Sequence, residues 1–209
     1  MSVENRVDAI AKDGSLSVDV KLSKLQALIS EWIASVNGEG LQYLVTAMIS
    51  SDDHTISRQV LAFFRLQIQE NLERDGQLLM LQFALTAIEK RPSHFRAEEM
   101  HLRRAIARLY EDSAEWDNAA NVLSGLGAET AFAALHPNGT DAQKAHFCVA
   151  HYLSIANSLL QGEHIAESEN QAGRCRQYVG RLANISFEGL RSSLLKSRFS
   201  LIQAQLSDR

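Results

Sequence analysis

Apolar side chains recur at helical spacing along almost the whole 209-residue chain, and this periodicity restricts the fold more than any other feature. Leu25, Ile29 and Trp32 fall on one face of a helix because an α-helix turns once in about 3.6 residues. Comparable apolar stripes occupy residues 22–32, 61–68, 78–88, 102–109, 148–159, 165–179 and 195–206. The alternation that is typical of β-strands is absent from the sequence. The pattern therefore predicts an all-α fold.

Residues that break helices are scarce, and they mark the expected loops. The chain has only two prolines, Pro92 and Pro137, and proline interrupts a helix because it lacks a backbone N–H group. We expect further breaks at Asn37–Gly40 and at Asp75–Gly76, and residues 131–139 are the clearest loop. The sequence thus predicts about nine helices joined by short loops, which antiparallel neighbours favour. We predict a right-handed stack of antiparallel helical hairpins.

Polar residues at the expected helix ends predict individual caps. Asp53 or Thr55 is a suitable N-cap for the helix that follows, because a short polar side chain can accept a hydrogen bond from a free N–H group. Ser113 is an expected N-cap in the same way. Thr140 and Gln143 have the spacing of a capping box, in which each side chain bonds to the other's backbone.

A weak internal repeat supports the hairpin stack. The run Ile106–Tyr110, followed by Trp116, matches the run Ile155–Leu159, followed by Ile165, at an offset of 49 residues. Each run contains an alanine, which allows helix backbones to approach closely. Tetratricopeptide-like proteins stack hairpins in this way, although this period is longer than theirs.

Charge and cysteine content restrict the function classes. The net charge of −4 is mild and argues against a chain that chiefly binds nucleic acid or anionic membranes. Two isolated cysteines, Cys148 and Cys175, favour a reducing compartment over a disulfide framework. The N-terminus shows no signal-peptide pattern, and no apolar run approaches the about 20 residues that cross a bilayer.

The last forty residues are locally basic. They contain Arg174, Arg176, Arg181, Arg191, Lys196, Arg198 and Arg209 but only two acidic residues, Glu188 and Asp208. Little aromatic character accompanies these side chains, so we interpret them as a solvated face rather than a nucleic-acid site.

No motif for catalysis, phosphate binding or metal binding occurs in the sequence. The nearest candidate is His146, Cys148 and His151, but His146 and Cys148 lie about 200° apart on a helix and cannot share an ion. We interpret this segment as a core cysteine flanked by partly exposed histidines. We therefore predict no catalytic, metal-binding or cofactor-binding residue, no cofactor and no enzymatic activity.

Two further features receive a structural interpretation. The pairs Glu98–Glu99 and Arg103–Arg104 have the spacing of ion pairs on a solvated helix face. Trp116 could anchor a protein interface, but its spacing to Ala120 and Leu123 favours core packing. No partner-binding residue is assigned from the sequence.

Two stretches of the chain resemble a known family. The first runs from Phe95 to Glu111 and on through Trp116–Leu126 to Glu129–Thr130, and the second is Ile56–Leu61. Together they are similar to the fourth subunits of the COP-nine signalosome, which carry a Trp-x-x-Ala-Ala hairpin and a Ser-Arg-Gln segment. The resemblance is good over residues 40–130 and weaker after residue 140.

The resemblance implies a PCI-family α-solenoid with a scaffold role. The signalosome removes the ubiquitin-like modifier Nedd8 from cullin-RING ubiquitin ligases, and its zinc chemistry belongs to another subunit. The implied partners are other signalosome subunits and a cullin-RING ligase, in the cytoplasm and nucleus. Family members are about twice as long and end in a winged-helix PCI domain. We therefore expect this chain to be part of a longer protein, with residues 1–17 disordered and residues 18–209 forming one helical-repeat domain.

Two alternative functions stay open at this point. A proteasome-lid paralogue would share the Trp-x-x-Ala-Ala hairpin, whereas the Ser-Arg-Gln segment favours the signalosome. An RNA- or translation-associated PCI-family subunit would account for the basic C-terminal residues.

Overall fold

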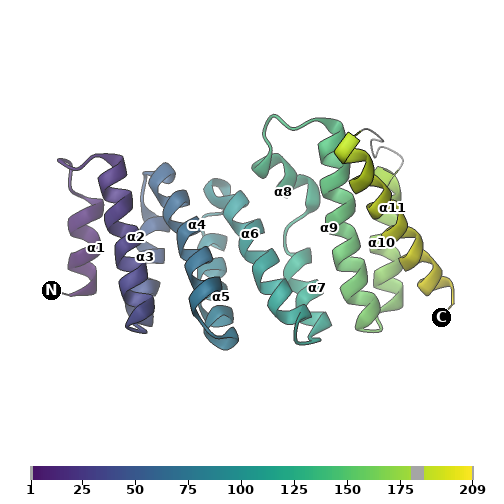
Figure 1. Ribbon diagram of the computed structural model, residues 1–209, viewed down its shortest axis with the longest axis horizontal. Helices are drawn as coiled ribbons and strands as arrows, with labels where there is room; N and C mark the ends of the chain where they lie inside the picture. Colours follow the sequence, from purple (N-terminus) through teal and green to yellow (C-terminus); the bar gives the residue numbers. More distant parts are fainter. Residues whose placement is uncertain (1, 180–185, 209) are drawn as a thin grey trace. The chain divides into compact units, whose positions relative to one another are not determined.

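A computed structural model of the chain describes residues 2–179 and 186–208, and eleven α-helices contain most of these residues (Figure 1). No strand occurs in these two ranges, so the prediction of an all-α fold is confirmed. The contacts between residues group the chain into two compact units, Met1–Ala105 and Ile106–Arg209, where the sequence predicts a single domain over residues 18–209. The boundary between these two units falls inside the sixth helix.

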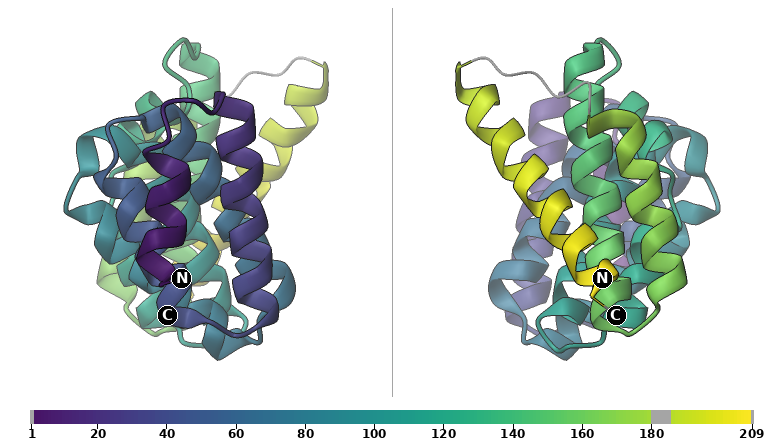
Figure 2. Two further views of the ribbon diagram at one scale, coloured as in Figure 1. Left: turned by 90° about the vertical axis from the view of Figure 1, so that its left-hand side faces the viewer. Right: turned by 90° about the vertical axis from the view of Figure 1, so that its right-hand side faces the viewer.

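The first unit is built from antiparallel helices in two layers. Its helices are α1 (Val3–Ala11), α2 (Val18–Ala34), α3 (Gly38–Ser50), α4 (His54–Asn71), α5 (Arg74–Glu89) and the first part of α6 (Pro92–Glu111). Helices α1, α3 and α5 pack side by side in one layer, and α2 packs against α4 in the other. Each helix also contacts its neighbour in the chain from α1 to α5, as Figure 2 shows on its left for α1 and α2.

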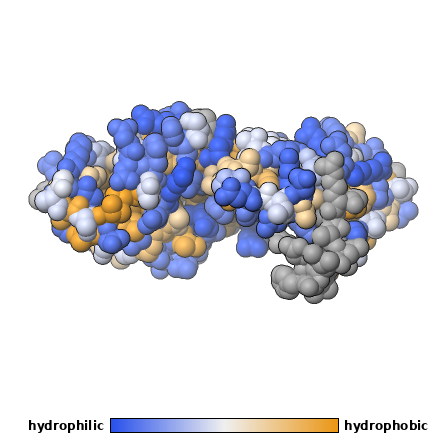
Figure 3. Space-filling model, turned by 90° about the horizontal axis from the view of Figure 1, so that it is seen from above, coloured by the Kyte–Doolittle hydropathy of each residue, from blue (hydrophilic) through white to orange (hydrophobic). Residues whose placement is uncertain are grey.

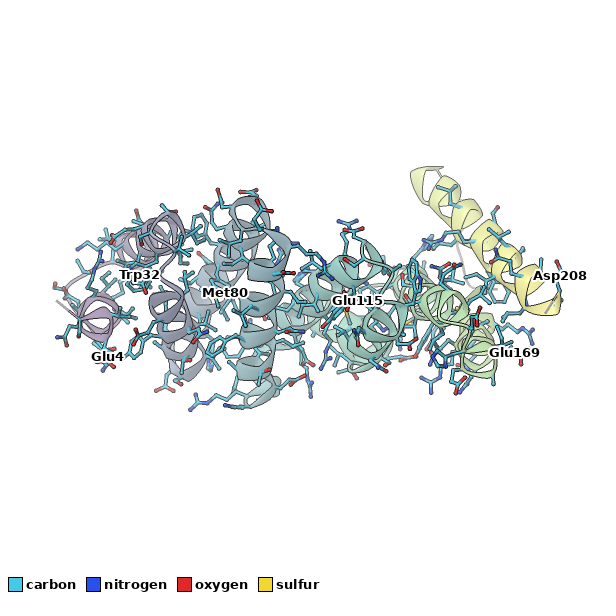
Figure 4. All side chains as sticks on the ribbon, turned by 90° about the horizontal axis from the view of Figure 1, so that it is seen from below. Glu4, Trp32, Met80, Glu115, Glu169 and Asp208 are labelled. Atoms are coloured by element: carbon cyan, nitrogen blue, oxygen red, sulfur yellow. The ribbon has the colours of Figure 1, made fainter. Side chains whose placement is uncertain are left out.

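The core of the first unit is formed by the stripes that the sequence predicts. Leu25, Ile29 and Trp32 of α2 are all buried, and in Figure 4 Trp32 and Met80 lie among the helices, whereas Glu4 lies at the outer edge. Trp32 packs against the backbone of α3, and a Cβ atom at Gly40 would lie 2.7 Å from its Cδ2 atom. Glycine at this position therefore permits the close approach of α2 and α3.

The second unit is organised around one long helix. It contains the end of α6, then α7 (Trp116–Ser124), α8 (Ala128–Leu135), α9 (Asp141–Gln161), α10 (Ile165–Val179) and α11 (Ser186–Ser207). Helix α9 packs against α7, α8, α10 and α11, and the right-hand view of Figure 2 shows α11 crossing α9 and α10 obliquely. The predicted stripe of α11 is buried here through Leu195, Phe199 and Ile202.

The helix caps agree with the sequence in two of three places. The Asp53 carboxylate accepts a hydrogen bond from the backbone N–H of Ile56 at 3.1 Å and caps α4. Thr140 and Gln143 form the predicted capping box at the start of α9. The prediction for Ser113 is wrong, because α7 begins after Glu115, which makes no side-chain capping bond.

Three hairpin turns share one geometry. In the turn from α2 to α3, Val36 adopts a left-handed conformation, with φ of 53°, and the N–H groups of Val36 and Asn37 donate to the carbonyls of Ile33 and Trp32. This pair of bonds is a Schellman motif. Ala114 and Glu163 occupy the same position after α6 and α9. Because these two residues are 49 positions apart, the turns confirm the internal repeat of the sequence.

Several predicted breaks lie inside helices. Asn37 caps α3, so that helix begins at Gly38 rather than near Leu41. Asp75 and Gly76 belong to the first turn of α5, where an acidic residue is favourable because it faces the positive end of the helix dipole. The loop predicted over residues 131–139 is shorter in the structure, because α8 extends to Leu135. Helices α1 and α8 are the additional ones that bring the number in the described residues to eleven, where about nine are expected.

The N-terminus also differs from the expectation of disorder over residues 1–17. Residues Val3–Ala11 form α1, and Ser2 caps this helix by accepting a hydrogen bond from the N–H of Asn5. Val7 is fully buried, and Arg6 donates two hydrogen bonds of 2.6 Å to the carboxylate of Glu31 in α2. The apolar face of α1 is short, with Val3, Val7 and Ile10 at helical spacing, and of these residues only Val7 is fully buried.

Candidate protein-binding groove

The histidine and cysteine candidates of α9 are core residues. His146 and His151 are both buried, although the sequence predicts partial exposure. Cys148 and Cys175 are free and buried, as predicted from their apolar positions. Burial raises the pKa of Cys148 to about 11 and that of Cys175 to about 12, so both thiols are protonated at neutral pH. Among the residues that the structure describes, no group of three His, Cys, Asp or Glu side chains is placed to hold a metal ion.

The charged residues of α6 form a buried network instead of a solvated face. Glu99 is 1% exposed and Arg103 is 7% exposed. Glu99 accepts hydrogen bonds from Arg103 at 3.0 Å and from Arg96 at 2.8 Å, and Arg103 also donates to Glu89 of α5 at 2.8 Å. The predicted ion-pair spacing is correct, and Arg104 is exposed as predicted, but the predicted exposure is wrong for Glu99 and Arg103, because Arg103 turns toward α5. The network ties α6 to α5 within the first unit.

A second polar cluster lies in the second unit. The Glu129 carboxylate accepts hydrogen bonds from the hydroxyl groups of Tyr152 at 2.9 Å and Tyr178 at 2.5 Å. Burial favours the neutral form of Glu129, but the hydrogen bonds from both phenols and from the backbone outweigh it and lower the pKa of Glu129. Burial and the bond to Glu129 raise the pKa of Tyr152 to about 12. The cluster joins α8, α9 and α10 and has the character of a structural network.

The remaining sequence candidates are distributed over the second unit. Trp116 is half-buried at the start of α7 rather than fully in the core. Arg174 lies over the ring of Tyr152 at 5.8 Å, and Arg176 approaches the side-chain amide of Gln203. Arg198 is exposed. The side chains of Arg181, Arg191 and Arg209 lie outside the described part of the chain.

A groove along α3 is the most promising binding surface. Two adjoining hollows meet over the exposed side chains of Thr46 and Ser50, which line both of them. One hollow, of about 260 Å³, lies between α3 and α5 and is lined by Thr46, Ile49, Ser50, Phe83, Thr86, Ala87, Lys90 and Arg91. The other, of about 490 Å³, lies between α1 and α3 and is lined by Asp8, Ala11, Lys12, Tyr43, Thr46, Ala47, Ser50, Ser51 and Asp52.

The layer packing of the first unit explains why this groove exists. Helix α3 is flanked by α1 and α5 in the same layer. The outer face of α3 carries the small residues Thr46, Ala47 and Ser50, whereas its buried face carries large apolar side chains such as Leu44 and Met48. Small side chains on a helix between two neighbours leave a channel along its surface. This channel is called the α3 groove below.

The two ends of the α3 groove carry different charges. Lys90 and Arg91 close the α5 end, and the Arg91 guanidinium approaches the carbonyl oxygen atoms of Ser50 at 3.3 Å and Ile49 at 3.5 Å. At the α1 end, Lys12 is paired with Asp8 at 2.7 Å, and Asp52 is exposed. The α5 end is therefore basic, and the α1 end is slightly acidic.

Other surface features of the first unit are smaller. A cleft of about 160 Å³ lies beside α4 and α6, and Leu61, Phe64, Arg65, Glu98 and His101 are among the residues that line it. Burial and two nearby cations lower the pKa of His101. Figure 3 shows hydrophobic side chains gathered on the side of the first unit that is seen from above. Val18 and Val20, at the start of α2, are among the exposed apolar residues of this unit.

None of the helices in the described ranges combines the length and the apolar character that a bilayer crossing requires.

Comparison with known proteins finds similarity to a signalosome subunit. No protein-family model matches the chain. Over 150 residues, which are 71% of this chain, the sequence is 27% identical to COP9 signalosome complex subunit 4 of Arabidopsis thaliana. The chain resembles a signalosome subunit. The match covers 36% of that plant protein, so the chain spans about a third of the length of the curated relative it matches.

This match agrees with the resemblance found in the sequence, and it supports a relationship to signalosome subunits. The all-helical fold and the similarity to such a subunit together favour a scaffold role for this chain. The α3 groove could not be predicted from sequence, because no motif marks it. The only available signal was the set of small residues at 46, 47 and 50, which interrupts the otherwise large side chains of α3.

Proposed function

We propose that this protein is a non-catalytic scaffold subunit of the COP9 signalosome. In this proposal its helical hairpins bind other signalosome subunits. The N-terminal helices engage a cullin-RING ubiquitin ligase and support removal of Nedd8 by another subunit, in the cytoplasm and the nucleus. The observation that carries the proposal is the 27% identity to a signalosome subunit over 71% of the chain.

The structure supports a binding role in two ways. Stacked antiparallel hairpins present extended surfaces, and repeat proteins use such surfaces to bind partners. In addition, two groups of titratable residues form hydrogen-bonded networks within the core, namely Glu99 with Arg103 and Glu129 with Tyr152. A scaffold needs rigid hairpins of this kind, and buried polar networks that are fully paired stiffen them.

The alternative functions differ in what supports them. A proteasome-lid scaffold subunit would have the same helical architecture, and it is separated from the proposal only by sequence similarity. An RNA-associated role would depend on the basic C-terminal residues, but Arg174 and Arg176 contact side chains of their own unit. This engagement leaves fewer of the basic residues available to bind phosphate groups.

Affinity purification from the protein's own cells tests the proposal. The protein is tagged at its own locus, and mass spectrometry measures the molar ratio of each co-purified subunit, with the tag alone as the control. We expect signalosome subunits at near-equal molar ratio and cullins at a lower ratio. Recovery of proteasome-lid subunits or translation factors at equal ratio, without signalosome subunits, would contradict the proposal.

A further inference from the structure

We infer that the α3 groove binds a short acidic-apolar segment of a partner protein, in which a large apolar side chain lies next to acidic residues. The apolar side chain would enter the hollow beside Phe83, and the acidic residues would pair with Lys90 and Arg91. The inference deepens the proposed scaffold role, because it names the chemistry of one partner site. It does not depend on which complex the protein joins.

The floor of the hollow suits an apolar side chain. Phe83 and Ala87 of α5 are only half-buried, and they line the hollow together with Ile49 of α3. Covering this apolar lining with an apolar side chain of the partner is favourable, because it removes apolar surface from water. At about 260 Å³ the hollow is smaller than the about 300–1,000 Å³ of most small-molecule pockets. It is therefore better suited to one or two side chains of a protein segment.

The rim of the hollow favours negative charge. Lys90 and Arg91 are both exposed, and no Asp or Glu lines this hollow. Arg91 is held in place by its contacts with the last carbonyl groups of α3. A guanidinium has five N–H donors, so Arg91 retains donors for a carboxylate while it keeps these contacts. A cation that is fixed before binding loses less side-chain entropy when the ligand arrives.

The far end of the α3 groove gives the bound segment a direction. Asp52 is exposed at the α1 end, whereas Asp8 is already paired with Lys12 and with the hydroxyl of Tyr43. A segment that continues past Thr46 toward α1 therefore meets a weakly negative surface. Its acidic residues are favoured only at the α5 end, so opposite charges at the two ends select one orientation.

The test measures binding of a defined peptide to the purified chain. The probe is a fluorescein-labelled peptide with the core Leu-Phe-Glu-Glu, and its control has the core Leu-Phe-Gln-Gln. We expect saturable binding of the acidic peptide, at least about twofold tighter than that of the neutral peptide. This ratio follows from two exposed charge pairs, each of which is typically weak. Salt should reduce the difference, because it screens exposed charges.

Two variants locate the site. Lys90→Gln should weaken binding of the acidic peptide about two- to fivefold, whereas Lys24→Gln, which removes an exposed lysine from α2, should leave it unchanged. Thr46→Glu places a negative charge on the groove floor, and we expect binding to fall at least about tenfold. Glutamate has a higher helix propensity than threonine, so the fold is retained, and the melting temperature verifies this.

Three results would overturn the inference. These are equal binding of the acidic and neutral peptides, no saturation at about 1 mM peptide, and undiminished binding by folded Thr46→Glu. Failure of the inference is distinguishable from failure of the proposed function. If signalosome subunits co-purify but the peptide does not bind, only the groove assignment is rejected. If the peptide binds but no signalosome subunit co-purifies, only the complex assignment is rejected.

Discussion

The buried ion network of α6 makes a strong prediction about stability. Arg103→Ala removes the partner of one oxygen atom of Glu99, whose side chain is 2% exposed. Arg96 still pairs with the other oxygen, but its own side chain is 36% exposed. Breaking a buried ion pair costs about 3–5 kcal/mol because a buried charge is left uncompensated. We expect the free energy of unfolding to fall by about 3 kcal/mol, which is the lower end of this range, because Arg96 still pairs with Glu99.

Tryptophan fluorescence can follow this loss in the first unit alone. The chain has two tryptophans, Trp32 in the first unit and Trp116 in the second. In a Trp116→Phe background, urea unfolding monitored by fluorescence reports on Trp32, which is buried. The free energy of unfolding is then compared with and without Arg103→Ala, in the same background.

A double variant separates the charge effect from lost packing. Replacing a buried ion pair by apolar residues of similar volume is often neutral for stability. Glu99→Leu combined with Arg103→Met should therefore be more stable than Arg103→Ala alone. A loss below about 1 kcal/mol for Arg103→Ala would refute the reasoning, since surface ion pairs contribute that little. A double variant as unstable as the single one would refute it as well.

Three further predictions follow from individual contacts. Gly40→Ala should lower the free energy of unfolding in urea by about 1–3 kcal/mol, because the new Cβ atom would overlap the buried Trp32. Gly38→Ala is the control and should not lower it, because no atom lies within 4 Å of a Cβ at Gly38. Val36→Gly should raise the melting temperature, with a gain of about 0.5–1 kcal/mol, because Val36 is left-handed and 82% exposed. Tyr152 should titrate near pH 12, and its contribution to stability should be full below pH 10 and lost as the pH rises to 12. Phenolate absorbance measures this titration, and Glu129→Gln should move it to lower pH.

The fold was predictable from sequence where periodicity is strong. The stripe of α2 and the capping box of α9 were both found, because each is a local pattern with a direct physical cause. Helix α1 was missed because its apolar stripe spans only two turns, and because the pair of Arg6 with Glu31 that also holds it joins residues 25 positions apart. Such a contact leaves no trace in a local pattern.

The environment of charged residues was harder to predict. The spacing of Glu99 and Arg103 indicates an ion pair but not whether the pair is buried, which depends on the position of α5. The α3 groove depends in the same way on α1 and α5 lying on either side of Thr46 and Ser50. Sequence patterns describe one helix at a time, whereas a groove is formed by three.

The Nedd8 content of cullins tests the central claim most directly. The gene for this protein is deleted in its own organism, and immunoblotting measures the fraction of each cullin that carries Nedd8. In the proposed role this protein supports removal of Nedd8 by another subunit, so we predict that this fraction rises in the deletion strain and that the intact gene restores it. An unchanged fraction in the deletion strain would contradict the account.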